Sequence, residues 1–409
     1  MVPLGWCRCG GARPKATEYG KEFIKNLDQP QRLWEHAYSR QLSEPAQGLL
    51  LVLGTLASDV LLEDAERAFL AVWPQESDHP LANAHVSPFS SSLRELDGTF
   101  IKSVKDLEGQ IVISFQNPSI RDFVEYKLRL DGRVAYSILE KSVFFEQVVR
   151  LDEVMRTSSA MTGDFSARWS DALGRASERT LDQSGCTLLP IHMNGGGVQF
   201  RRLQNTLEER IAAFLEAIHD AAGGVVRPHI DQLLAVLLSK WRDGSLSPEN
   251  AELVLDAVEG NTHIDAEQKR HVAQQCAEAL LEGEADFATF KAYGVLREKL
   301  PQPTEEALVR FHGKFLDALD SMLSLDGCDD PASAHETIDE VESAATSLGL
   351  DIAREIAAAH EKAEEIGEPN YDRADDESLR PRQTTEGLCE TLSDDDIDQI
   401  FSALDHVRH

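Results

Sequence analysis

The chain has 409 residues, 42% of them hydrophobic, and a formal net charge of −31 at pH 7. That length and apolar content can supply the cores of about two or three domains, so disorder throughout the chain is excluded. The acidic balance disfavours nucleic acid and anionic membrane surfaces as partners, because both bind clustered Lys and Arg.

The distribution of apolar and cysteine residues predicts a cytoplasmic protein. No run approaches the roughly 20 apolar residues that cross a bilayer, so no membrane partner is expected. The six cysteines lie mostly far apart and follow no recognisable secretory leader, which favours free thiols in a reducing compartment. Cys7 and Cys9 lack the second pair that a zinc site needs, so no metal is predicted there.

The N-terminal part divides at about residue 18. Residues 1–17 are rich in Gly, Pro and Arg without periodicity, which predicts an irregular leader. Residues 18–42 carry apolar side chains at three- and four-residue steps on both sides of Pro30. This spacing predicts two short helices.

The segment 43–130 contains three helix patterns and then a strand pattern. The first helix follows Ser43, which stands where an N-cap residue is expected. The second runs from about Leu61 to Pro74, and the third follows Ser87 and carries an apolar stripe of Phe89, Leu93, Leu96 and Phe100. The segment 110–115, which is rich in β-branched and apolar residues, predicts a strand. This order predicts a winged helix-turn-helix domain.

The remainder of the chain is predicted to be mainly α. Residues 131–180 form a helical extension, and residues 181–206, with Pro190 and three consecutive glycines, form a Gly/Pro-containing linker. Helical stripes from 207 to 366 predict an all-α helical bundle or a solenoid-like array without a fixed repeat period. Within it, Ser333 and Glu336 form a capping-box pattern at a helix start.

Residues 367–409 are predicted to be an acidic, largely disordered tail. They lack the apolar residues that would offset the entropy of ordering. Within the tail, residues 393–407 fit a short amphipathic helix with aspartates in its first turn. Such a helix would dock onto a partner or onto the body of the chain, or would fray at the end of the array.

No catalytic constellation is recognisable in the sequence. A P-loop needs Gly-x-x-x-x-Gly-Lys-Ser/Thr after a strand, and the nearest approach, Gly20-Lys21-Glu22, lacks the first glycine and the hydroxyl. No His-Glu-x-x-His and no Gly-x-Ser-x-Gly pattern occurs. We therefore predict no enzymatic activity, no catalytic residue, no metal and no cofactor for this chain by itself.

One motif has a recognisable relative. The chain contains Gln29-Pro30 and Leu33-Trp34, and later Asn117-Pro118-Ser119-Ile120-Arg121-Asp122-Phe123. These residues resemble the winged-helix region downstream of the nucleotide-binding core in a novel family of STAND-type NTPases. A histidine often precedes the asparagine in that family, and Gln116 occupies its place here. The family occurs in bacterial and phage-defence contexts, so the resemblance implies signal transduction and antiviral defence.

The resemblance also implies a role for the motif. In an intact STAND protein this corner faces the nucleotide, so Asn117, Ser119 and Arg121 become candidate cofactor-binding residues. The residues by themselves support a second interpretation, in which Asn117 ends the strand, Ser119 caps the following helix and Arg121 pairs with a neighbouring loop. Both interpretations remain open at the level of sequence.

Three hypotheses about function follow. In the first, the chain is the non-catalytic regulatory or sensor portion of a STAND-type NTPase, truncated or split from its ATPase core, with a separate NTPase or effector chain as its protein partner. In the second, it is a free-standing acidic α-helical adaptor that binds another protein. The third, DNA binding by the winged helix, is less favoured because acidic residues offset Arg94, Lys102 and Lys105.

Overall fold

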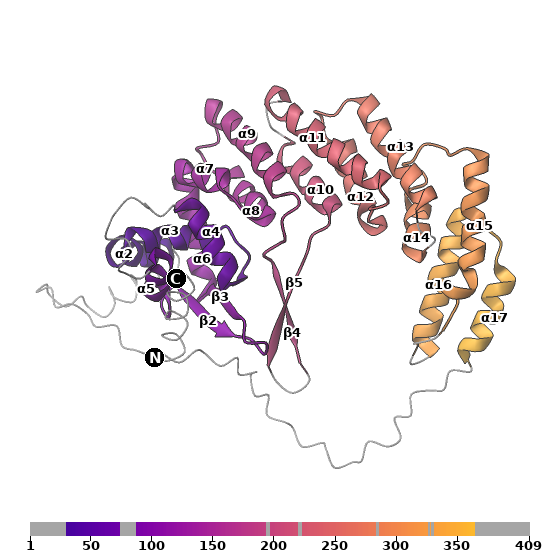
Figure 1. Ribbon diagram of the computed structural model, residues 1–409, viewed down its shortest axis with the longest axis horizontal. Coiled ribbons are helices and arrows are strands. Elements are labelled where there is room, and N and C mark those ends of the chain that lie inside the picture. The colour runs from indigo at the N-terminus through magenta and orange to yellow at the C-terminus, as the bar shows by residue number, and fades with distance from the viewer. Residues whose placement is uncertain are drawn as a thin grey trace, which may run out of the picture.

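The computed structural model is mainly α-helical and describes residues 30–73, 87–193, 197–219, 223–283, 286–325, 328 and 331–364 (Figure 1). The predictions for the leader, for the first short helix before Pro30 and for the tail 367–409 lie outside the described residues. No helix in the described part of the chain has the length and apolar content to cross a membrane.

Five helices surround the first part of the core: α2 (Pro30–Gln41), α3 (Glu44–Leu53), α4 (Leu62–Val72), α5 (Pro88–Leu96) and α6 (Pro118–Leu130). Ser43 is the N-cap of α3, as predicted, and its hydroxyl accepts a hydrogen bond from the Ala46 N–H. Most apolar residues of α3 are buried, which makes it the central helix of this part. The buried ones are Ala46, Leu49, Leu50, Val52 and Leu53.

A small antiparallel sheet accompanies these helices. Its strands are β1 (Asp59–Leu61), β2 (Ile101–Lys105) and β3 (Ile111–Phe115), in the order β1-β3-β2. The register pairs Val60 with Ile113 and Val104 with Val112. Only β3 was predicted from the sequence. The two other strands are short, and β1 leads directly into α4, so the helical stripe of α4 hides it.

The helix α5 is shorter than its apolar stripe predicted. It ends at Leu96, and Gly98 then adopts a φ of +70° that favours glycine. The backbone N–H of Phe100 still bonds to the carbonyl of Leu96, so the turn returns Phe100 to the core, where it is buried. The four-residue spacing from Leu96 to Phe100 therefore comes from a tight turn after the helix and not from the helix itself.

The helical extension consists of α7 (Gly132–Glu140), α8 (Phe145–Arg156) and α9 (Gly163–Thr180). The predicted helical extension over 131–180 is therefore confirmed as three helices, with a break between α7 and α8. Gln147 explains the break, because its side-chain oxygen accepts hydrogen bonds from the N–H groups of Val143 and Phe144 at the start of α8.

The prediction of a linker over 181–206 was wrong for much of that segment. Residues Leu188–His192 (β4) and Val198–Arg202 (β5) form an antiparallel hairpin. Sequence periodicity failed here because apolar residues lie on both faces of β4, so no alternation of polar and apolar residues marks the strand.

The last part of the described chain is all helix apart from its turns. Its elements follow one another along an arch (Figure 1). The main hydrophobic core of the described residues is continuous from Tyr38 to Ala363, and a second, smaller cluster lies between the three-stranded sheet and Leu188. The capping-box prediction at Ser333 was wrong, because its helix begins at Pro331. The elements are α10 (Leu207–Ala217), α11 (Gly223–Arg242), η2 (Pro248–Asn250), α12 (Ala251–Gly260), α13 (Ala266–Glu282), α14 (Phe287–Leu296), α15 (Glu305–Met322), α16 (Pro331–Leu348) and α17 (Ala353–Glu364).

Candidate functional site

The motif Asn117–Phe123 forms the corner between β3 and α6. Asn117 is the N-cap of α6, and its side-chain oxygen accepts a hydrogen bond of 2.9 Å from the Ser119 N–H. Pro118 occupies the first helical position, where a missing N–H costs nothing. The side chain of Asn117 therefore caps the helix, and the prediction that Ser119 would be the cap was wrong.

Ser119 and Phe123 attach α6 to α2. The indole N–H of Trp34 donates to the hydroxyl of Ser119 over 3.1 Å. The buried ring of Phe123 meets the ring of Tyr38 edge-on, with 5.5 Å between ring centroids. Two motif residues thus hold two N-terminal helices together.

Arg121 contacts a different part of the structure. One guanidinium nitrogen donates to the carbonyl of Leu56 over 3.1 Å, and another donates to the hydroxyl of Ser58 over 2.5 Å. These atoms belong to the segment that joins α3 to β1. The predicted pairing of Arg121 with a neighbouring loop is therefore confirmed.

Beside Arg121 lies a carboxylate shared by three guanidinium groups. Glu125, whose side chain is 11% exposed, pairs with Arg121 at 3.5 Å, with Arg129 at 3.3 Å and with Arg150 of α8. A buried carboxylate requires such partners, because removing them would leave its charge desolvated. Burial, and then the positive charge of Arg150, lower the pKa of Arg121 from its usual value.

Arg121 and Arg150 line a cavity of about 230 Å³ where the N-terminal part meets α8 and α10. The lining contains two guanidinium groups and two carboxylates, of Glu146 and Glu153, so its formal charges balance. The complete lining is Leu56, Ala57, Arg121, Phe145, Glu146, Val149, Arg150, Glu153, Asn205 and Ala213. We call this space the junction cavity.

The polar side chains that line the junction cavity are two arginines, two glutamates and one asparagine. No serine, cysteine, threonine or histidine lines it, so the carboxylates of Glu146 and Glu153 are the groups in the lining that could act as a nucleophile or base. Arginine forks recognise carboxylate or phosphate oxygens in a bidentate manner. The guanidinium groups of Arg121 and Arg150 are therefore suited to a carboxylate or phosphate group.

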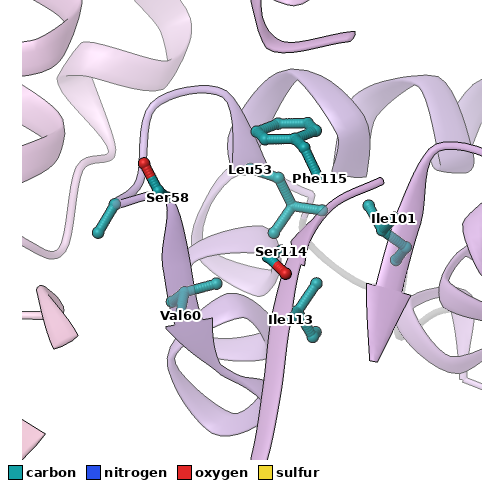
Figure 2. Close-up of a pocket in the computed structure, with 8 residues that line it drawn as sticks. Leu53, Ser58, Val60, Ile101, Ile113, Ser114 and Phe115 are labelled. Atoms are coloured by element: carbon teal, nitrogen blue, oxygen red, sulfur yellow. The ribbon is translucent and has the colours of Figure 1, made fainter. Parts of the chain in front are cut away.

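A second pocket near the corner is too small for a ligand. Figure 2 shows its mainly apolar lining, in which Leu53 of α3, Ile101 of β2 and Ile113 and Phe115 of β3 lie together with Ser58 and Ser114. Its volume of about 10 Å³ admits no more than one water-sized sphere. This pocket belongs to the packing between α3 and the sheet.

The structure separates the three predicted site residues. Arg121 lies in the wall of the junction cavity, whereas Asn117 and Ser119 make the cap and the contact to Trp34 described above. Sequence reasoning missed Glu125 and Arg150. The spacing of four residues on each side of Glu125, to Arg121 and Arg129, was a usable signal, but nothing local links Glu125 to Arg150.

Comparison of this chain with protein-family models, with curated proteins and with solved structures found no match. Within the described ranges, no group of three or more His, Cys, Asp or Glu side chains could hold a metal ion.

Proposed function

We propose that this chain is the non-catalytic regulatory or sensor portion of a STAND-type NTPase, acting in signal transduction and in antiviral defence. The observation that carries the proposal is the position of Arg121, the arginine of the family-like motif, in the wall of the junction cavity. An NTPase chain or domain that carries the nucleotide is then the partner.

The order of elements supports a winged helix within residues 43–130. A helix, a short strand, two helices and a β-hairpin follow one another as α3, β1, α4, α5, β2 and β3, with β1 at one edge of the sheet. This is the order expected of a winged helix-turn-helix in which the hairpin forms the wing. The proposed winged helix contributes Arg121 through the corner that follows β3.

Shared contacts suggest how the junction cavity would transmit a signal. Arg121 bonds to the segment after α3, while Glu125 joins the guanidinium groups of α6 to Arg150 of α8. A phosphate or carboxylate that entered the cavity would compete with Glu125 for Arg121 and Arg150. The packing of the winged helix on α8 would then depend on the occupant, as coupling between two sites requires.

The proposal predicts that the purified chain does not hydrolyse MgATP. Released inorganic phosphate should stay at the level of a protein-free blank, because the sequence lacks a P-loop to hold the nucleotide phosphates. Turnover that disappears in the Arg121→Ala variant would contradict a non-catalytic role. Arg121→Lys, which keeps the positive charge, is the matched control. Turnover that both variants retain would come from a contaminating enzyme.

DNA binding through α5 receives little support from the packing. Five of its nine residues are buried, Phe89, Ser90, Ser92, Leu93 and Leu96. The carboxylate of Glu95 accepts hydrogen bonds from the backbone and the hydroxyl of Ser43. A salt-dependent shift of duplex DNA in a gel would overturn this assessment.

A specific observation favours the adaptor as a second candidate. Between α14 and α16 lies a groove of about 700 Å³. Small residues such as Gly294, Ser343 and Ala344 line it, and Glu336 and Asp339 add negative charge. Such a groove could receive a side of a partner helix.

The adaptor predicts a stable partner whose binding depends on this groove. Replacing the exposed Ser343 by Trp would fill the groove and should weaken co-purification of the partner, whereas Ser343→Ala should not. A pull-down without a stable partner, together with a monodisperse monomer by light scattering, would count against the adaptor.

A further inference from the structure

Two histidine rings meet where the helices α16 and α17 pack together. These helices lie side by side at the end of the arch (Figure 1). His335 on α16 faces His360 on α17, with 2.8 Å between the two Nδ1 atoms and 5.0 Å between the ring centroids. Two ring nitrogens at this distance need a positive charge or a proton between them, because two lone pairs or two N–H groups would repel each other.

The distances suit a metal ion as well as a shared proton. A tetrahedral zinc ion with Zn–N bonds of about 2.0 to 2.1 Å holds two ligand nitrogens about 3.3 Å apart and the centroids of their imidazole rings about 5.2 Å apart. The centroids of His335 and His360 already have nearly this separation. A tilt of the two rings would therefore admit the ion without a displacement of either helix.

A neighbouring carboxylate favours His360 as a ligand. Oδ1 of Asp339, one helical turn after His335, lies 3.8 Å from Nε2 of His360. Histidines that bind a metal commonly turn their other ring N–H toward a carboxylate, which fixes the tautomer and strengthens the ligand nitrogen. Asp339 thus favours the proton on Nε2 of His360 and leaves the lone pair of Nδ1 directed at His335.

The surroundings of the pair are accessible and acidic. The side chain of His360 is 35% exposed, and His335 lines the α14–α16 groove together with Glu336 and Asp339. The one basic side chain in that lining, Lys291, is paired with Glu340 at 3.0 Å. A cation can therefore reach the rings from solvent, and the local charge favours it.

We propose that His335 and His360 bind a divalent transition-metal ion of the class that imidazole prefers, namely zinc, nickel or copper. Within the described residues no cluster of three or more ligand side chains surrounds the pair, so water completes the coordination. Such an open site binds more weakly than a zinc site with four protein ligands. Because the two ligands come from different helices, the ion fastens α17 to α16.

Zinc titration of the full chain tests the site. The chain is first freed of metal with a chelator and then followed by isothermal calorimetry near neutral pH, where imidazole is available as a ligand. His335→Asn and His360→Asn should each remove one equivalent of zinc or weaken its binding at least about tenfold. Asparagine can still form hydrogen bonds but replaces the imidazole ligand. His271→Asn, at an exposed position of α13, is the matched control and should leave the titration unchanged.

Hydrogen exchange locates the bound ion. Zinc should slow amide exchange of α17 in the unaltered chain and in the His271→Asn variant, but not in His335→Asn or His360→Asn. Equal zinc stoichiometry and affinity in the His335→Asn and unaltered chains would overturn the proposal and leave the pair as an N–H···N hydrogen bond. Exchange of α17 that zinc leaves unchanged would likewise contradict an ion that joins the two helices.

Discussion

Single residues define how closely the elements approach one another. Gly54 caps α3 where it meets α6, and a Cβ atom at this position would lie 2.3 Å from a methyl group of the buried Val124. Sequence reasoning did not single out Gly54, because nothing near it in the chain reveals that α6 passes so close. Arg121 was identified only because its motif resembles a known family.

Replacing Gly54 by Ala should destabilise the protein by about 1 to 3 kcal/mol, since the added methyl group overpacks the contact with Val124. Urea unfolding followed by circular dichroism measures this change. Gly313, in α15, is the matched control: a Cβ atom there meets nothing within 4 Å. Gly313→Ala should therefore stabilise by roughly 0.5 to 1 kcal/mol. Equal unfolding midpoints for the two variants would refute the close approach at Gly54.

The buried thiols should resist alkylation in the native protein. Burial, and then the carboxylate of Glu146, raise the pKa of Cys186 to about 12, while burial and then Glu208 raise the pKa of Cys276 to about 12. At pH 8 both side chains are then almost entirely in the unreactive thiol form. Iodoacetamide labelling with peptide mass mapping should modify the half-buried Cys328 before Cys186 and Cys276, which are buried. Rapid labelling of Cys276 without denaturant would contradict this burial.

At the scale of elements, sequence periodicity predicted helices far better than strands. A helical stripe repeats over three or more turns in α4 or α15, whereas β1 has only three residues and gives almost no pattern. The hairpin of β4 and β5 was mistaken for a linker because Pro190 and the glycines before Val198 are typical of loops. Its strands depend on packing against a sheet that lies far away in sequence.

The corner before α6 offers a test of a single helix start. Asn117→Ala removes the side-chain acceptor for the Ser119 N–H and should cost about 1 kcal/mol of stability. Asn117→Asp retains an acceptor and should remain close to the unaltered protein, because Asp and Asn cap helices almost equally well. Chemical unfolding of the two variants measures the difference. If Ala and Asp were equally tolerated, the capping role of Asn117 would be refuted.

At the scale of the whole molecule, the sequence predicted a mainly α protein but not the arrangement of its helices. The junction cavity brings together Leu56, Arg121, Arg150 and Ala213, which lie more than 150 residues apart at the extremes. Their approach depends on how α8 and α10 pack on the N-terminal part, and a local pattern carries no information about that packing. The ion pairs of Glu125 then fix α6 to α8.

The central claim is that the junction cavity faces an NTPase. A photo-crosslinking amino acid at position 153, on the exposed rim of the cavity, tests this directly in the cells from which the chain derives. Position 306, exposed on α15, serves as the control. The account predicts a covalent product from position 153, and not from position 306, with a polypeptide that contains a P-loop. Products that lack a P-loop sequence, or equal yields from the two positions, would contradict it.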